Sequence, residues 1–412
     1  MLVIEARVAL SSPRFPGDRS RVRQQDDYVI GIEMVGGTDW IGGQIYVRNL
    51  IASLSRLPAG ERPEIVLTGY VTDDNISREL LTFEGVRLGP QGFSSDRALW
   101  HNRLRNKTRR LRRLLTGSDP WYQHIDVVYP IMGPPGPAGS IFWIPDFQHM
   151  YLPDFFTREE RVVRSSCYEA ISEENAVVVL SSQMAAQDFK RLFPAARAEP
   201  MLLRFCSVMD PLPPLQDPRP RYGLPAQFIY VPNQFWLHKN HEQVLRALGI
   251  LRCRGVRIPL VCTGHMEDYR SPGHVERINH LVRANSLDDA VHFLGLLPRQ
   301  EQIQLFRYAA VVVQPSRFEG WSTVIEDARA LGRPTILADF PVHREQMPDS
   351  HFFPLDDDEA LADALQTFWR DARPGPDLYA EECARIDALR RQRRCARDFL
   401  KIVQRSRELS QI

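Results

Sequence analysis

Two charged residues in this sequence lie where they could bind a phosphorylated ligand. Lys239 follows the segment VPNQFWLH and lies where an amphipathic helix is expected to begin. A cation at that end of a helix opposes the helix dipole, so a bound phosphate would explain it; a solvated surface lysine is the alternative. Glu319 precedes Gly320 in PSRFEGWSTVIE, again just before a helix. A carboxylate on a glycine turn beside free helix N–H groups suits a ligand with hydroxyls at one end and phosphates at the other.

Two loops in the first half of the chain could complete such a site. Gly42 and Gly43 belong to a glycine-rich turn, GGTDWIGGQ, that precedes a helical pattern. Missing side chains would let backbone N–H groups and the helix dipole reach an anion, although ordinary loop chemistry explains the same glycines. Asp146 and His149 follow the strand-like run SIFWIP. They could act as polar catalytic groups in a cleft, and a turn aspartate with a packed histidine is the alternative.

Two acidic patterns have structural explanations that need no ligand. Thr323 and Glu326 have the T-x-x-E spacing of a helix capping box. The three consecutive aspartates at 356–358 contain a D-x-D pattern that could bind a metal. Asp356 also begins a D-x-x-E pattern with Glu359, so we interpret the run as a helix cap and expect no metal site.

The elements that must position these loops alternate regularly along the chain. Strand-like apolar runs are expected at 28–34, 64–70, 126–132, 140–146 and 176–182, with helical stretches such as 158–174 and 183–192 between them. In the second half the runs FIYVPN, PLVCTG, VHFLG, AVVVQPS and PTILAD again alternate with helices. Strands separated by helices predict an α/β protein with doubly wound parallel sheets, in which ligands lie beyond the carboxyl ends of the strands.

A proline-rich segment divides this pattern into two domains. Six prolines between Cys206 and Gln227 prevent regular structure there. We therefore expect a first Rossmann-like domain at 1–206, a linker at 207–227 and a second domain at 228–377. Residues 378–412 contain a long Arg-rich helical pattern with no strand after it.

The composition limits the class of protein and its partners. Hydrophobic residues make up 43% of the 412 residues and charged residues 25%, as in an ordinary folded protein. The formal net charge of +1 gives no whole-protein field for nucleic-acid binding. No apolar run approaches the ~18–20 residues of a membrane helix, Glu5 and Arg7 interrupt any signal peptide, and the six cysteines form no C-x-x-C pattern. These observations predict a cytoplasmic protein. The Arg-rich segment 97–113 is interpreted as a solvated helix face, with contact to anionic lipid at the inner face of a membrane as the alternative.

Several motifs together resemble those of a known enzyme family. VPNQFWLHKNHEQVLRAL, VCTGH, VHFLGLLP and PSRFEGWSTVIEDARALGRPTILAD occur in an order and spacing that resemble the donor domain of the retaining family 4 glycosyltransferases of GT-B fold. GGTDWIGGQIYVRNL and WIPDFQH resemble acceptor-domain loops of the same enzymes. The resemblance implies two Rossmann-like domains that face each other across a cleft. The second would hold most of a nucleotide-diphosphate sugar, and the helix at 378–412 would pack back on the first, acceptor-side domain.

The resemblance also implies roles for individual residues. Lys239 would neutralise the donor diphosphate, Glu319 would hold hydroxyls of the transferred sugar, and Glu326 would hold the ribose. Asp146 and His149 are the candidates for orienting the acceptor or the transferred sugar, and with Glu319 they form the candidate catalytic set. The other implied nucleotide-sugar contacts are Gly42, Gly43, Asn233, Gln234, Gly264, Leu296, Gly320, Trp321, Ser322, Thr323 and Val324.

The implied reaction is transfer of a sugar, with retention of configuration, to a hydroxyl of a glycan, glycolipid or related acceptor in polysaccharide biosynthesis. Cationic groups and N–H donors would stabilise the leaving diphosphate, so we expect neither a metal nor a cofactor beyond the donor itself. The sequence departs from the family pattern twice. Six residues rather than seven separate Glu319 from Glu326, and Gln234 stands where an arginine is usual. Arg204 or Arg317 would replace that cation.

Two alternatives remain open at this point. A noncatalytic sugar-nucleotide-binding subunit would explain both departures, because it needs binding without turnover. A GT-B-like sugar-nucleotide epimerase would share the two-domain architecture and would release an altered sugar still attached to its nucleotide.

Overall fold

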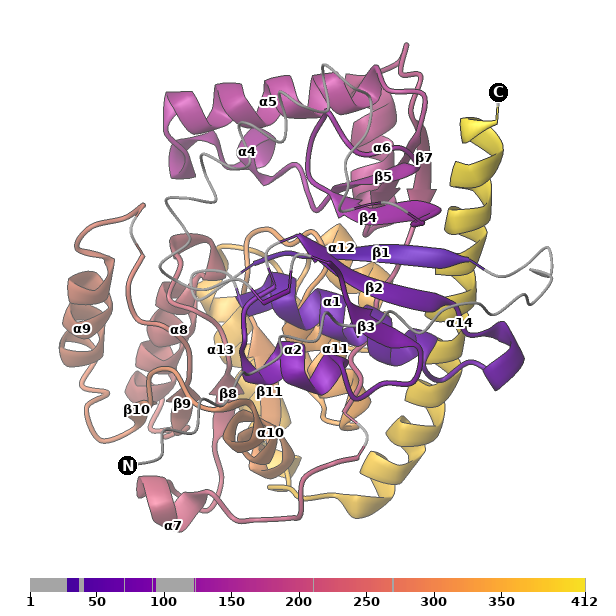
Figure 1. Cartoon of the computed structure of the whole chain (residues 1–412). Helices are drawn as coiled ribbons and strands as arrows, with labels where there is room; N and C mark the ends of the chain where they lie inside the picture. The colour runs from indigo at the N-terminus through magenta and orange to yellow at the C-terminus, as the bar shows by residue number, and fades with distance from the viewer. Residues whose placement is uncertain are drawn as a thin grey trace, which may run out of the picture.

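Two parallel β-sheets, each covered by helices, make up the part of the chain that the structure describes (Figure 1). The structure is a computed structural model that describes residues 28–36, 41–69, 71–90, 92–93, 122, 124–209, 211–268 and 270–411. We call the part with the first sheet the first domain and the part with the second sheet the second domain.

The first domain contains seven parallel strands in the order β3-β2-β1-β4-β5-β6-β7. The strands are β1 Val29–Met34, β2 Glu64–Gly69, β3 Val86–Leu88, β4 Val127–Ile131, β5 Ser140–Ile144, β6 Val177–Leu180 and β7 Glu199–Leu202. The helices are α1 Ile41–Leu54, α2 Asn75–Leu80, α4 Gln148–Tyr151, α5 Arg158–Ser172 and α6 Gln183–Leu192, with 3₁₀ turns η1 Ala59–Glu61 and η4 Pro153–Phe155.

The second domain contains six parallel strands in the order β10-β9-β8-β11-β12-β13. The strands are β8 Ile229–Val231, β9 Leu260–Cys262, β10 Val291–Phe293, β11 Val311–Gln314, β12 Thr335–Ala338 and β13 His351–Phe353. The helices are α8 His241–Cys253, α9 His274–Ala284, α10 Arg299–Tyr308, α11 Thr323–Ala330, α12 Pro341–Gln346 and α13 Asp358–Asp371, with the 3₁₀ turn η5 Leu237–Lys239. The short helix α7 Arg219–Tyr222 lies in the segment 207–227, so the expectation that the prolines prevent regular structure there is wrong for these residues.

Apolar β-branched runs account for interior strands of both sheets. β6 reads VVVL and β11 reads VVVQ, and every residue of both strands is buried. Strands that are covered by helices on both faces need such continuous apolar runs, because neither face meets water. The one polar residue in these two strands is Gln314, at the carboxyl end of β11.

The strand order places a crevice in each domain. In the first sheet the order reverses between β1 and β4, and in the second between β8 and β11. Loops leave the two sides of such a point in opposite directions, so a crevice opens beyond the carboxyl ends of these strands. The second crevice therefore lies where the loops after β8 and β11 meet.

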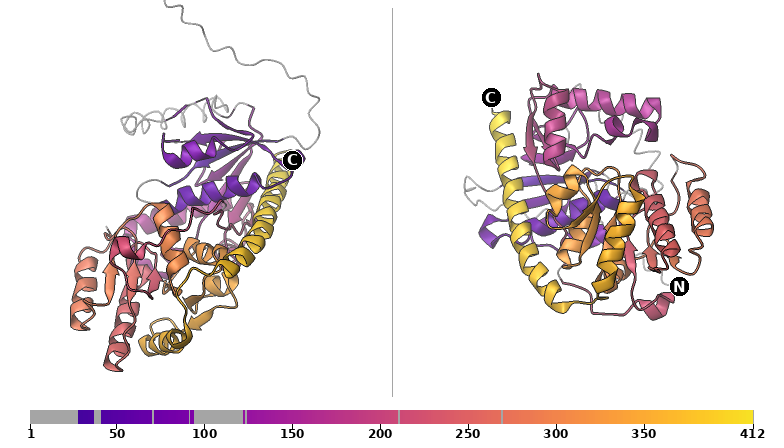
Figure 2. Two further views of the ribbon diagram at one scale, coloured as in Figure 1. Left: turned by 90° about the horizontal axis from the view of Figure 1, so that it is seen from below. Right: turned by 180° about the vertical axis from the view of Figure 1, so that it is seen from behind.

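The last helix joins the two domains. α14 Leu378–Ser410 begins on the second domain, where Glu381 forms a buried ion pair with Arg307. Farther along, its side chains Ala396, Phe399 and Val403 belong to the core of the first domain. Figure 2 shows this yellow helix reaching from the second domain to the first. The expected α/β architecture of two doubly wound domains with a returning C-terminal helix is confirmed.

Candidate functional site

Lys239 and Glu319 meet at the crevice of the second domain. Lys239 ends the 3₁₀ turn η5 after β8, and Glu319 lies in the loop between β11 and α11. A backbone hydrogen bond from the Arg317 N–H to the His238 carbonyl holds the two loops together. The Lys239 Nζ lies 2.7 Å from Glu319 Oε1, and the two side chains are only 15% and 9% exposed. The sequence therefore places a cation and a carboxylate in direct contact at the expected end of the sheet.

The N-terminus of α11 lies directly after this loop. Ser322 caps the helix, because its Oγ accepts a hydrogen bond from the Ile325 N–H. The amide of Gln346 binds the backbone of Ser322 twice, accepting from its N–H at 2.8 Å and donating to its carbonyl at 3.0 Å. The capping box predicted at Thr323 is therefore wrong: the cap lies one residue earlier. Thr323 and Val324, in the first turn of α11, line the cleft, and the N–H groups of a helix N-terminus favour an anion.

A cleft of about 260 Å³ lies between the two domains and contains most of the predicted site. The predicted residues that line it are Gly42, Asp146, Asn233, Gln234, Lys239, Gly264, Leu296, Glu319, Gly320, Trp321, Thr323 and Val324. Of the described residues predicted for the site, Gly43, His149, Ser322 and Glu326 do not line this cleft.

The two domains touch at the loop that carries Glu319. A Cβ atom on Gly320 would lie 2.4 Å from the Pro145 carbonyl oxygen and 2.9 Å from the Asp146 Cβ, so only glycine fits. The neighbouring Trp321 reaches across the interface, and its indole N–H donates to the Phe205 carbonyl at 2.9 Å. The structure is therefore closed at this end of the cleft.

Asp146 faces the cleft from the first domain. It follows β5, and its Oδ1 accepts the Gln148 N–H at 2.8 Å, which fixes the turn. Burial raises the pKa of this carboxyl above its usual value, and the Gln148 N–H and the Arg164 and Lys239 cations oppose that rise. Asp146 thus serves both as a turn residue and as a carboxyl group in the cleft.

His149 is a packed histidine, which is the alternative interpretation of this residue from the sequence. It is 3% exposed and packs edge-on against Tyr168 and Phe156, with its Nε2 3.3 Å from Ser165 Oγ. Burial, assisted by the positive charge of Arg164, lowers the pKa of this imidazole to about 4. The prediction that His149 faces the cleft is wrong, because the apolar contacts of α5 hold its ring in the interior.

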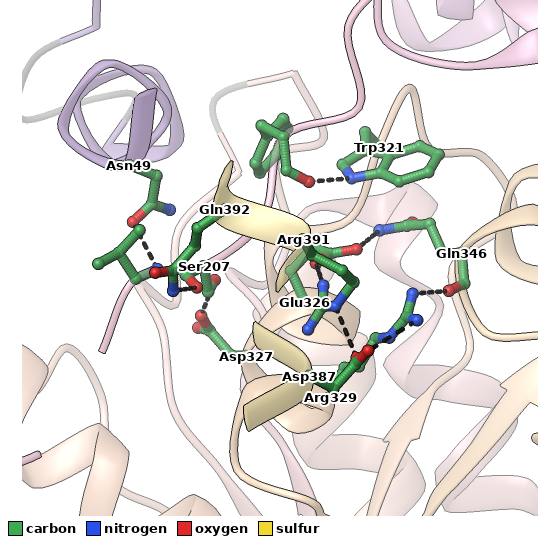
Figure 3. Close-up of polar contacts among 12 residues, drawn as sticks. Asn49, Ser207, Trp321, Glu326, Asp327, Arg329, Gln346, Asp387, Arg391 and Gln392 are labelled. Atoms are coloured by element: carbon green, nitrogen blue, oxygen red, sulfur yellow. Dashed lines mark hydrogen bonds and ion pairs between the residues drawn. The ribbon is translucent and has the colours of Figure 1, made fainter. Parts of the chain in front are cut away.

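Glu326 is the second site residue that the structure places elsewhere. It is 1% exposed, and its Oε2 forms an ion pair of 2.6 Å with Arg391 of α14 (Figure 3). Gln346 donates a further hydrogen bond to its Oε1 at 3.3 Å. Glu326 therefore holds the last helix, and its predicted position beside a ribose is wrong.

Asp327, the residue after Glu326, lies in the cleft where Glu326 was predicted. It lines the cleft, accepts the Ser207 hydroxyl and forms a bidentate ion pair with Arg299 at 2.6 and 2.7 Å. Figure 3 shows Asp327 directed toward Ser207, away from Arg391. Seven residues separate Asp327 from Glu319, which is the usual family spacing with aspartate in place of glutamate. Counting that spacing along the sequence would have found it.

Neither cation proposed from the sequence to replace the arginine missing at Gln234 lines the cleft. Arg204 pairs with Glu345 and Arg317 pairs with Asp356, and neither lines the cleft. Both replacements proposed from the sequence are therefore wrong. Arg299, at the start of α10, does line the cleft.

The aspartate run at 356–358 has three separate structural roles. Asp356 pairs with Arg317, Asp357 caps α13 by accepting the Ala360 N–H, and Asp358 pairs with Arg246 at 2.6 Å. A helix cap is present in this run, but the cap predicted at Asp356 is wrong by one residue, because Asp357 caps the helix. Within the described ranges no group of three or more His, Cys, Asp or Glu side chains could hold a metal ion.

Two further predictions concern membranes. Segment 97–113 lies outside the described residues. None of the helices in the described part of the chain combines the length and the apolar character needed to span a bilayer.

Comparison with solved structures identifies the fold. Sucrose-phosphate synthase from Thermosynechococcus elongatus superimposes with a TM-score of 0.60 at 17% identity, covering 93% of this chain and 98% of that one. HepE from Anabaena, in complex with UDP and glucose, gives a TM-score of 0.61 at 15% identity and covers 93% of this chain and 100% of that one. With two doubly wound domains and a returning helix, the molecule has the GT-B fold.

Sequence comparison identifies the family of the second domain. Residues 219–386 match the model of the family glycosyl transferases group 1, so this segment is a domain of that family. A protein of Bacillus subtilis (strain 168) named as a glycosyltransferase, EpsF, is 36% identical over 102 residues. That match spans about a quarter of each protein, 24% of this chain and 24% of EpsF.

Proposed function

We propose that this protein is a retaining glycosyltransferase that moves a sugar from a nucleotide-diphosphate donor to a hydroxyl of a glycan, glycolipid or related acceptor. The observation that carries the proposal is the contact between Lys239 and Glu319 at the N-terminus of α11. A cation and free helix N–H groups suit a diphosphate, and a carboxylate beside them suits sugar hydroxyls. The group 1 glycosyltransferase family of the second domain supports this assignment.

In this proposal the donor lies along the second domain. Lys239 and the N–H groups of Thr323 and Val324 hold the diphosphate, while Glu319 holds hydroxyls of the transferred sugar. Asp327 takes the ribose hydroxyls, because it lies in the cleft at the family spacing. The UDP and glucose bound by HepE, which shares the fold, support a nucleotide sugar as the ligand.

The reaction is then the replacement of the sugar–phosphate bond by a sugar–acceptor bond on the same face of the ring. The departing diphosphate gains negative charge as the sugar becomes oxocarbenium-like, and Lys239 with the α11 N–H groups stabilises that charge in a closed cleft. These groups supply the positive charge that a divalent ion supplies elsewhere, so the proposal includes neither metal nor cofactor. Asp146, across the cleft from Glu319, orients the acceptor or the transferred sugar.

The proposed setting is polysaccharide or glycolipid synthesis in the cytoplasm. Segment 97–113 would bring the enzyme to the inner face of the membrane through its arginines, because anionic lipids attract clustered cations. Nucleic acid is not among the proposed partners.

A donor panel tests the proposed function. Melting temperature is recorded with UDP, GDP, ADP and dTDP sugars, each with magnesium and with EDTA. A donor that stabilises the protein is then incubated with candidate glycan and glycolipid acceptors. We expect one nucleotide family to stabilise the protein equally in both conditions. Mass spectrometry should detect the glycosylated acceptor, and NMR should show the anomeric configuration of the donor.

Matched variants locate the effect in the cleft. Lys239→Met should lose the stabilisation, whereas Arg317→Met, which removes a cation paired with Asp356 outside the cleft, should keep it. Binding without transfer to any acceptor would favour the noncatalytic subunit, and a changed sugar still attached to its nucleotide would favour the epimerase. An inverted product or a requirement for magnesium would contradict the proposed mechanism.

A further inference from the structure

Gln314 is a buried amide behind the proposed sugar site. It ends β11, after three valines, and none of its surface is exposed. Its Nε2 donates to Glu319 Oε1 at 2.8 Å, and its Oε1 accepts from Asn233 Nδ2 at 2.8 Å. The same Nε2 lies 3.0 Å from Ser316 Oγ and 3.2 Å from Ser322 Oγ. One side chain therefore contacts the loop after β8, the loop after β11 and the cap of α11.

The chemistry of the partners fixes the orientation of this amide. An ionised carboxylate accepts hydrogen bonds and donates none, so Glu319 must face the NH₂ group of Gln314. The carbonyl oxygen then faces Asn233, which donates its own NH₂. Flipping the amide would set oxygen against oxygen at Glu319 and NH₂ against NH₂ at Asn233. The observed arrangement is therefore the one in which both contacts are satisfied.

Gln314 also gives Glu319 a second point of attachment. Lys239 Nζ and Gln314 Nε2 both bind Oε1, from the loop after β8 and from the end of β11. A carboxylate that is held by one flexible lysine can swing with it, whereas a second donor on a buried strand fixes its direction. Within the described part of the chain both hydrogen bonds to Glu319 end on Oε1, so Oε2 is left for a ligand hydroxyl.

We propose that Gln314 is a positioning residue of the transfer site. It holds the Glu319 carboxylate in the direction that the transferred sugar needs and links it to Ser322 at the diphosphate end of the site. This inference rests on the proposed function, in which Glu319 contacts the sugar. An apolar side chain would fill the end of β11 at a lower desolvation cost, so an amide that contacts Glu319, Asn233 and Ser322 indicates a positioning role.

Two substitutions of similar shape separate positioning from packing. Gln314→Met fills the same space without donors. We expect kcat to fall about 10- to 100-fold, the range for a lost hydrogen bond to a charged group, with KM for the donor changed less than threefold. Gln314→Glu sets a carboxyl group against Glu319. Two ionised carboxylates would repel each other, so kcat should be low at neutral pH. It should recover as the pH falls, when the protonated Glu side chain can donate as glutamine does.

A buried glutamine outside the cleft supplies the control. Gln304 is 6% exposed, and its amide binds the Pro214 carbonyl and the Gln216 N–H. Gln304→Met should lower the melting temperature and leave kcat and the pH profile unchanged. Wild-type kcat in Gln314→Met, or a wild-type pH profile in Gln314→Glu, would overturn the inference while the proposed function stands.

A binding measurement gives a readout that does not depend on turnover. Calorimetry without acceptor measures the ratio of the Kd for the nucleoside diphosphate to the Kd for the nucleotide sugar. Because Gln314 acts on the sugar end of the donor, Gln314→Met should reduce this ratio about twofold, in line with the small change in KM, while the Kd of the nucleoside diphosphate stays the same. An unchanged ratio overturns the positioning role, whereas a wild type that binds donor but never transfers sugar overturns the proposed function alone.

Discussion

At the residue scale, the site is built from pairs of opposite charges that are partly buried. Lys239 and Glu319 are each poorly exposed, and each would be costly to bury without the other. Asp327 and Arg299 form a second such pair in the lining of the cleft. Before a donor binds, each charged side chain in these pairs has its partner as a hydrogen-bonding group. The phosphates and hydroxyls of a bound donor would replace some of these contacts.

The neighbouring acids Glu326 and Asp327 should respond oppositely to loss of charge. Glu326→Gln removes the negative charge that pairs with the buried Arg391 guanidinium. We therefore expect a loss of about 3 kcal/mol in the free energy of unfolding, with little change in nucleotide affinity. Asp327→Asn should weaken nucleotide binding about 10-fold with a smaller loss of stability, because Arg299 is partly exposed. Urea unfolding and calorimetry measure the two effects. The reverse pattern would show that Glu326 is the ribose residue after all.

His149 should make the fold sensitive to acid. Its folded pKa of about 4 lies below the ordinary 6.5, so the unfolded chain binds a proton that the folded chain does not. The stability is therefore complete above about pH 6.5 and falls as the pH drops toward 4, by at most about 1.4 kcal/mol per pH unit for one group. His149→Gln should flatten this fall in urea unfolding between pH 4 and 6.5. An unchanged slope would mean that the imidazole takes up its proton in the folded state.

At the element scale, short-range sequence patterns predict strands and helices better than they predict where those elements end. The runs expected at 64–70 and 140–146 form β2 Glu64–Gly69 and β5 Ser140–Ile144. The short strands β3, β7 and β13 have too few apolar residues to form a recognisable run. The loops that carry Lys239 and Glu319 could be found because each follows a strand.

The start of α11 shows why the remaining site residues escaped prediction. Its cap depends on Gln346, 24 residues away in sequence, and the direction of Glu326 depends on Arg391, 65 residues away. Contacts across such separations leave no periodic signal in the chain. Gln314 also escapes prediction, because in the strand pattern it is only the polar residue that ends an apolar run.

The cap of α11 can be tested with two adjacent substitutions. Ser322→Ala removes the side chain that accepts the Ile325 N–H, and we expect a loss of about 1 kcal/mol in the free energy of unfolding. Thr323→Ala, at the first helical position, should cost less than about 0.5 kcal/mol. Chemical denaturation measures both. A larger effect at Thr323 would restore the capping box predicted from the sequence.

At the scale of the whole molecule, the last helix and the linker join the two walls of the cleft. α14 is fixed to the second domain by the Arg307–Glu381 and Glu326–Arg391 pairs, and its apolar face completes the core of the first. Ser207 in the linker donates to Asp327, and Gln392 of α14 donates to the Ser207 carbonyl (Figure 3). The proposed ribose residue is thus hydrogen-bonded to the segment about which the domains would move, so donor binding and domain closure should be coupled.

Gly320 provides the sharpest test of this coupling, because it touches the opposite domain without a side chain. A Cβ in Gly320→Ala would lie 2.4 Å from the Pro145 carbonyl oxygen and 2.9 Å from the Asp146 Cβ, and neither atom is the far end of a flexible side chain that could move aside. The cleft of this variant should remain open where Gly320 meets Pro145. Its radius of gyration with bound nucleotide, measured by small-angle X-ray scattering, should exceed that of the wild type, and transfer should fall at least 10-fold. Because binding and closure are coupled, nucleotide affinity should also fall, although Lys239 and Asp327, which both belong to the second domain, should keep binding measurable.

A second glycine separates closure from a general effect of the added methyl group. Gly60 lies in η1 of the first domain, and a Cβ there would meet no heavy atom within 4 Å, so Gly60→Ala should behave as the wild type. If Gly320→Ala instead transferred sugar at the wild-type rate with an unchanged radius of gyration, the contact between Gly320 and Pro145 would not be needed for turnover. Transfer would then have to proceed with the cleft open, and water would have to be kept from the sugar by the second domain and the acceptor alone.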